Sequence, residues 1–128
     1  MARNLREATF ELITAARTPA GLESCSAGAR KAVNDAAALP TPVPRLDAAG
    51  HLSWHAADPV PATLALVARD ALDLVTAPEI AHVHECAGPG CQALFLDSSR
   101  PGTRRWCSMN TCGNRVKKET LRGRHEQP

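Results

Sequence analysis

Four cysteines in two close pairs constrain this chain more than any other feature. Cys86 and Cys91 are close in sequence, and so are Cys107 and Cys112. Four residues lie inside each pair and fifteen lie between the pairs. Two such pairs supply the four thiolates of a tetrahedral zinc site, whose sulfurs lie about 2.3 Å from the metal. The sequence therefore predicts one structural Zn²⁺ held by these four residues.

Disulfides are the main alternative for the same four residues. Residues 1–7 contain no apolar stretch, so we expect no secretion signal and a cytoplasmic location. Paired cysteines in a reducing compartment favour metal binding over disulfides. Four unrelated buried thiols are a further alternative. No apolar run approaches the ~18 residues of a membrane span, so no membrane association is expected.

The residues around the second pair resemble a known family. Trp106-Cys107-Ser108-Met109 is followed by Cys112-Gly113-Asn114-Arg115, and the latter tetrapeptide gives the CGNR-type zinc finger its name. Leu94-Phe95-Leu96-Asp97 and Arg104-Arg105 also match the usual run of that finger. The resemblance covers residues 86–124, about a third of the chain. Members of this family carry a helical ABATE domain before the finger and are described, largely by inference, as stress-induced transcription regulators.

The resemblance implies two domains. Residues 1–81 would form a helical ABATE-like domain with a hairpin near residues 43–55, and residues 82–128 would form the zinc finger. Family members usually have further sequence before this point. The front part is therefore expected to correspond to the C-terminal portion of a truncated ABATE domain.

Hydrophobic periodicity predicts three helices in the front part. Residues 4–17 and 22–39 repeat apolar side chains at helical spacing, and Asp58 is a candidate N-cap for a third helix ending near Val75. On that third helix we expect Leu64, Val67, Ala68, Ala71, Leu72 and Val75 to face the core. Cys25 is expected to be a small core residue.

Between the second and third helices, residues 43–55 predict a β-hairpin. Leu46 and Leu52 flank a turn at residues 47–50. Trp54 is expected to close one face of the hairpin onto the helices. His51 and His55 are expected to be exposed, with a second metal site as the alternative.

The finger is expected to contain strands at residues 82–85, 92–97 and 104–106, then a helix from about residue 109 to 122 capped by Asn110 or Thr111. The whole chain is thus α+β, with a treble-clef-like ββα finger. Phe95 and Trp106 are expected to form a small core beside the zinc, with a nucleobase platform as the alternative. His82 and His84 are expected at the surface, because four thiolates already complete the site.

Positive charge is concentrated in the finger. Residues 1–85 carry seven Lys or Arg and ten Asp or Glu, whereas residues 86–128 carry eight and three. A local basic patch is typical of a protein that binds a polyanion, although a solvated helix face gives the same pattern. The candidate nucleic-acid contacts are Arg104, Arg105, Arg115, Lys117, Lys118, Arg122 and Arg124.

Two functions remain open. In the first, a transcription regulator binds DNA through the basic finger. In the second, the finger is purely structural and the chain is a protein-interaction module. A homo-oligomer or a protein partner bound through the helical part is compatible with both. We expect no enzymatic activity, because four thiolates leave no open coordination position on the zinc.

Overall fold

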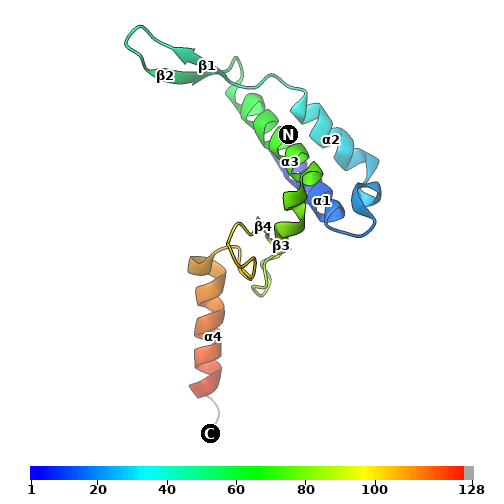
Figure 1. Ribbon diagram of the computed structural model, residues 1–128, viewed down its shortest axis with the longest axis vertical. Helices are drawn as coiled ribbons and strands as arrows, with labels where there is room; N and C mark the ends of the chain where they lie inside the picture. Colours follow the sequence, from blue (N-terminus) through cyan, green and yellow to red (C-terminus); the bar gives the residue numbers. More distant parts are fainter. Residues whose placement is uncertain (126–128) are drawn as a thin grey trace. The chain divides into compact units, whose positions relative to one another are not determined.

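The structure is a computed structural model that describes the backbone of residues 1–125 and the side chains of residues 1–122 (Figure 1). The chain divides into two compact units, Met1–Ile80 and a second unit that begins at Ala81. The first unit is helical with one hairpin, and the second holds a short hairpin, the four cysteines and a final helix. The α+β class predicted from the sequence is confirmed.

Three mutually packed helices form the first unit. They are α1 (Ala2–Ala16), α2 (Ala27–Ala37) and α3 (Pro59–Thr76), and each contacts the other two. The core they share is made mainly of small side chains, so the helices can approach closely. Its buried members are Leu5, Ala8, Leu12, Ala15, Cys25, Ala29, Val33, Ala36, Ala68 and Val75. Cys25 is the small core residue that the sequence predicted.

Helix α2 begins later than the periodicity predicted. Gly21–Ser24 form a separate 3₁₀ turn, η1, and Ser26 is the N-cap of α2, accepting a hydrogen bond of 3.1 Å from the Ala29 amide. The prediction of one helix over residues 22–39 was therefore wrong in its first turn. Ser26 sits at the start of α2 and not inside a longer helix, because its hydroxyl competes for backbone partners and so favours a cap over a helix interior.

Helix α3 turns most of the predicted face to the core, and Ala68, Ala71 and Val75 are buried as expected. Its buried residues are Ala62, Ala65, Ala68, Ala71 and Val75. Val67, which we expected inside, is 49% exposed. Leu64 and Leu72 pack only partly against the core. The row of alanines is selected because tightly packed helices leave little room for larger side chains between them. Asp58 occupies the N-cap position, but within this described segment its side chain makes no capping hydrogen bond.

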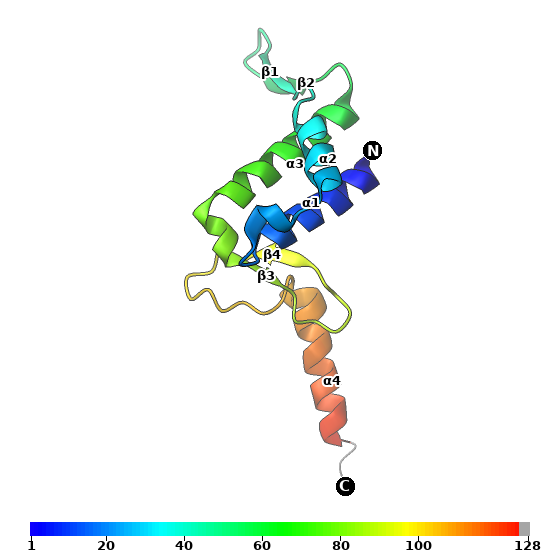
Figure 2. The same cartoon turned by 90° about the vertical axis from the view of Figure 1, so that its right-hand side faces the viewer.

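The hairpin joins β1 (Val43–Leu46) to β2 (Leu52–His55) as an antiparallel pair. The Asp47 carboxylate closes its turn by accepting from the amides of Ala49 at 2.9 Å and His51 at 2.8 Å. The hairpin projects from the ends of the helices (Figures 1 and 2). Trp54 is 64% exposed, so the prediction that it closes onto the helices was wrong. The histidines of the hairpin are exposed, as expected.

The second unit is built around a shorter hairpin. After the 3₁₀ turn η2 (Pro78–His82), strand β3 (Val83–Glu85) pairs antiparallel with β4 (Leu94–Leu96). Residues 104–106 form no strand, contrary to our prediction. The Ala87 amide does donate to the Arg105 carbonyl at 2.9 Å, but the Arg104 amide bonds instead to the Asp97 carboxylate. The Asp97 side chain thus takes a backbone amide that a third strand would need for pairing.

A single π-helical turn, η3 (Met109–Gly113), leads into α4 (Asn114–His125). The cap is Ser108, whose hydroxyl accepts from the Thr111 amide at 3.4 Å, and not Asn110 or Thr111 as predicted. π-helical turns are rare and are frequently found at functional sites. Within the described residues, no helix combines the length and the apolar character needed to cross a membrane.

Candidate metal centre

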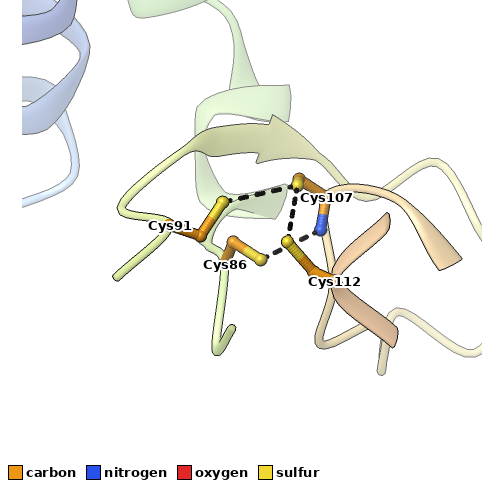
Figure 3. Close-up of side chains that lie close together, drawn as sticks. All are labelled: Cys86, Cys91, Cys107 and Cys112. Carbon is orange, nitrogen blue, oxygen red and sulfur yellow. Dashed lines mark hydrogen bonds between the residues drawn. The ribbon is translucent and has the colours of Figure 1, made fainter. Parts of the chain in front are cut away.

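The four cysteines of the two pairs converge on one point. Their Sγ atoms all lie within 4.8 Å of one another, and they face a common centre in Figure 3. Within the described residues this is the one group of such donors close enough to share an ion, and His82 and His84 are outside it. The sulfur of Cys107 lies 3.7 Å from that of Cys91 and 3.7 Å from that of Cys112.

These separations fit zinc. Four sulfurs placed tetrahedrally about 2.3 Å from a metal are about 3.8 Å from one another. A disulfide would require a sulfur–sulfur distance of about 2.05 Å. All five cysteines of the chain are free thiols. A set of four thiolates with this spacing is the donor set of a structural zinc site, so these side chains would hold one Zn²⁺.

The four ligands come from the β3–β4 loop, from the segment just before η3 and from η3 itself. Cys86 follows β3 directly, and Cys91 lies in the loop that returns to β4. Cys107 lies just before the capping residue of η3, and Cys112 lies within η3. The first pair is therefore presented by the β3–β4 loop itself. The strands predicted on either side of this pair are present as β3 and β4, but the strand predicted at residues 104–106, which would have placed a second hairpin between the pairs, does not form.

Backbone amides are directed at the sulfur of Cys86. The amide of Cys107 donates to it at 3.3 Å and that of Gly88 at 3.4 Å. These hydrogen bonds, that from Cys107 first, lower the pKa of Cys86 to about 6. The pKa of Cys112 is raised to about 12, chiefly by its hydrogen bond with Cys91 and then by burial. Metal binding requires deprotonated thiols, and a bound cation stabilises thiolates at such a site.

Two glycines make this packing possible. A Cβ on Gly88 would lie 3.0 Å from Cys112 Cβ and 3.1 Å from its sulfur. A Cβ on Gly113 would overlap Met109 Sδ and lie 3.2 Å from the Trp106 ring. Gly88 therefore lets the first loop approach a ligand of the second pair.

Two arginines of the predicted nucleic-acid set are hydrogen-bonded within the finger. Arg115 donates to the Pro89 carbonyl at 3.0 Å and to the sulfur of Cys112 at 3.8 Å. Arg104 donates through Nε to the Trp106 carbonyl at 2.9 Å and through its terminal nitrogen to the Cys107 carbonyl. It also lies over the Phe95 ring, 5.2 Å from its centroid. Both side chains therefore orient the loops that carry the ligands.

Asp97 was not predicted as a site residue, but it closes the loop before the second pair. It is 3% exposed, and its carboxylate accepts from the amides of Ser99 and Arg104, each at 2.9 Å. Hydrogen bonds from Ser99 and then Arg104 lower its pKa to about 2. The sequence signal for this turn is an Asp at the start of a short loop. Such an Asp commonly accepts a hydrogen bond from the amide two residues later, which here is that of Ser99.

Like Arg104 and Arg115, the other predicted contacts with described side chains are solvent-exposed. Arg105 lies over the Trp106 ring, 5.1 Å from its centroid. Lys117, Lys118 and Arg122 are exposed on α4. Arg124 falls within the bounds of α4, but its side chain lies outside the described residues. The structure thus divides the predicted contacts into a group at the metal loops and a group on the final helix.

An apolar hollow of about 380 Å³ lies beside α4. Trp106 is half-buried and forms one wall, while Val116 and Leu121 contribute side chains from the helix. Lys117 is the charged residue in its lining. At 100° per residue, the hollow and the row formed by Lys118 and Arg122 lie on different faces of α4.

Four thiolates on a short hairpin and a helix start define the second unit as a structural zinc finger, which follows a helical domain in the chain. Residues 82–125 match the CGNR zinc finger family, and residues 1–78 match the ABATE family, described as "Putative stress-induced transcription regulator". The chain therefore belongs to the ABATE family and carries a CGNR zinc finger. Compared with curated proteins, it has no significant match.

Proposed function

We propose that this protein is a zinc-dependent transcription regulator that binds DNA through the exposed basic face of α4. The observation that carries the proposal is the row formed by Lys118 and Arg122, which is solvent-exposed and makes no hydrogen bond or ion pair among the described side chains. Uncommitted cations on one helix face are suited to phosphate contacts. The family description supports a regulatory role.

Zinc has a structural part in this proposal. When bound, it supplies the positive charge that holds four thiolates together and so fixes the start of α4. Arg105, Arg115 and Lys117 add positive charge around the same unit, and Arg104 and Arg124 complete the proposed set. Four thiolates leave no open position for a substrate or water, so we propose a non-enzymatic role, in the cytoplasm and in response to stress.

The test is binding of labelled random-sequence duplex DNA, followed by fluorescence anisotropy over a series of salt concentrations. We expect affinity to fall steeply with salt, with a log–log slope of about −0.9 per neutralised phosphate. Replacing Lys118 and Arg122 together by Ala should reduce that slope by about 2. Arg45→Ala, which removes an exposed cation from the hairpin of the other unit, is the matched control and should leave it unchanged.

Chelator-stripped protein should lose this binding, because the finger no longer presents α4. Absence of binding by zinc-loaded protein at low salt would count against the proposal. A slope unaffected by the double substitution would show that other cations make the contacts.

The hollow beside α4 favours a second candidate function. An apolar hollow with one lysine in its lining suits an apolar side chain of a protein partner with a neighbouring carboxylate. In that case the finger is a protein-interaction module with a purely structural zinc. Leu121→Gln should abolish partner binding without changing the salt slope for DNA, which distinguishes the two candidates.

A further inference from the structure

The four cysteines of the metal centre are not equally accessible. Cys86 is 6% exposed and Cys112 is 2% exposed, whereas Cys91 and Cys107 are only half-buried. The two half-buried cysteines come from different sequence pairs, yet their sulfurs lie 3.7 Å apart (Figure 3). The centre therefore has a buried half and an accessible half. We call Cys91 and Cys107 the accessible pair.

Hydrogen bonds reinforce this difference between the sulfurs. The sulfur of Cys86 accepts from two backbone amides, those of Gly88 and Cys107, and the sulfur of Cys112 accepts from the Arg115 guanidinium. Among the described residues, the sulfurs of the accessible pair contact other cysteine sulfurs and accept from no amide or arginine. A donor directed at a thiolate reduces its reactivity as a nucleophile, because it withdraws electron density from the sulfur. The accessible pair lacks this protection.

Access to solvent decides which sulfur of the finger an oxidant reaches first. Zinc binding requires all four thiols to be deprotonated, so thiolate character does not distinguish them in the metal-loaded protein. An oxidised cysteine forms a disulfide when a second thiol lies close enough to react with it. For Cys91 that second thiol is Cys107, at 3.7 Å.

Cys112 is a poorer partner for Cys107 although it is equally close, at 3.7 Å. Cys112 is held within η3, where its amide donates to the Ser108 carbonyl at 3.0 Å. A Cβ on Gly88 would lie only 3.1 Å from the Cys112 sulfur, so the first loop packs tightly against that side chain. A disulfide from Cys107 to Cys112 would have to distort both the helical turn and this packing.

We propose that hydrogen peroxide oxidises the accessible pair to a Cys91–Cys107 disulfide, a reversible modification that releases the zinc. The Cys91 thiolate attacks one peroxide oxygen and the O–O bond breaks, which gives a sulfenic acid and hydroxide. The Cys107 thiolate then attacks the sulfenic sulfur, so that the S–S bond forms and a second hydroxide leaves. The two thiolates thus lose two electrons to the peroxide, and two protons from solvent convert the hydroxides to water. Two remaining thiolates are too few for a four-coordinate structural site.

The test treats the full zinc-loaded chain with small increments of hydrogen peroxide in the absence of DNA. A chromophoric zinc indicator follows metal release. Samples are quenched with catalase, denatured and alkylated with iodoacetamide, then reduced and labelled with N-ethylmaleimide, and tandem mass spectrometry locates the second label. At low conversion this label on Cys91 and Cys107 should exceed that on Cys86 and Cys112 by about tenfold. A non-reduced digest should contain the Cys91–Cys107 cross-link, with about one zinc ion released per disulfide.

Cys25 supplies the control. It is 3% exposed and belongs to the first unit, so it should stay reduced in the same samples. Cys25→Ser removes a thiol outside the metal centre and should change neither the cross-link nor the rate of zinc release. Dithiothreitol followed by Zn²⁺ should restore the metal content, since a disulfide is reversible and a sulfinic acid is not.

Retention of zinc in excess peroxide would overturn the proposal. A first disulfide inside either sequence pair would do the same, as would first oxidation at the buried Cys86 or Cys112. Zinc loss that reductant and added Zn²⁺ fail to reverse would also overturn it, because the damage would then be over-oxidation. All of these measurements are made without DNA, so their outcome is independent of the proposed DNA binding.

Discussion

Arg115 donates a hydrogen bond to the carbonyl of Pro89 across 3.0 Å, and so ties the start of the final helix to the loop that carries the first ligand pair. The same guanidinium also reaches the sulfur of Cys112 at 3.8 Å. The last residue of the CGNR tetrapeptide thus links both halves of the metal site. Its position gives a physical reason for an arginine there, apart from any contact with DNA.

Replacing Arg115 by Ala should weaken zinc binding by about 10- to 100-fold, the usual cost of losing a residue that orients metal ligands. Competition with a chromophoric chelator measures this affinity. Lys118→Ala removes a cation from the same helix without touching the ligand loops and should leave zinc affinity unchanged. Equal affinities for the wild type and Arg115→Ala would show that these hydrogen bonds do not support the site.

Gly88→Ala should also weaken zinc binding, since the added methyl would lie 3.0 Å from Cys112 Cβ. The Cβ and the sulfur of Cys112 would have to shift by a few tenths of an ångström, and both belong to a metal ligand. Gly28→Ala is the control, because in α2 the nearest atom would be 3.9 Å away and alanine favours a helix. Zinc titration of both variants checks the prediction, and an unaltered affinity in Gly88→Ala would contradict it.

Cys107→Ser should unfold the second unit and leave the first folded. Structural zinc binding contributes directly to folding of small metal-bound modules, whereas the helices of the first unit share a separate core. Circular dichroism should show that the helical signal of α1–α3 persists and that zinc content falls. Cys25→Ser should have the opposite effect, destabilising the helices with zinc content unchanged. Complete loss of helicity in Cys107→Ser would show that the units fold as one.

Glu11 should stabilise the helical unit in a pH-dependent manner. Its carboxylate accepts from the Ser26 amide at 2.7 Å, and this hydrogen bond lowers the pKa of Glu11 from 4.5. A lowered folded-state pKa gives stability that is fully present above pH 4.5 and is lost as the pH falls through the folded value. The difference in unfolding free energy between wild type and Glu11→Gln should therefore shrink on acidification below pH 4.5.

Urea unfolding at a series of pH values measures that difference, and the contribution of zinc cancels between the two proteins. Glu7→Gln is the matched control one helical turn away. Among the described side chains, Glu7 pairs with the exposed Arg3 and Arg6, and such pairs contribute little. A pH-independent difference for Glu11→Gln would show that the charge of Glu11 is not the stabilising feature.

Much of the site could be predicted from the sequence because its information is local. The spacing of the four cysteines and the tetrapeptide after Cys107 indicate one zinc finger, and the family comparison agrees. Proline and glycine mark the ends of the helices and the hairpin turn, whose φ of +84° at Gly50 favours glycine. These signals depend on residues close together in sequence, so they can be recognised before the fold is known.

Tertiary structure decided what depends on neighbours distant in sequence. Periodicity predicted Ala68, Ala71 and Val75 in the core, where they are buried, but Val67 from the same prediction is exposed. Trp54, which we expected to close the hairpin onto the helices, is exposed as well. A strand at residues 104–106 failed to form because the Asp97 carboxylate took the Arg104 amide. Two arginines that read as phosphate contacts proved to bind carbonyls of the ligand loops. The sequence alone determined which atoms would meet a metal, and only the packed chain determined which side chains hold those atoms in place, because their partners lie across the fold.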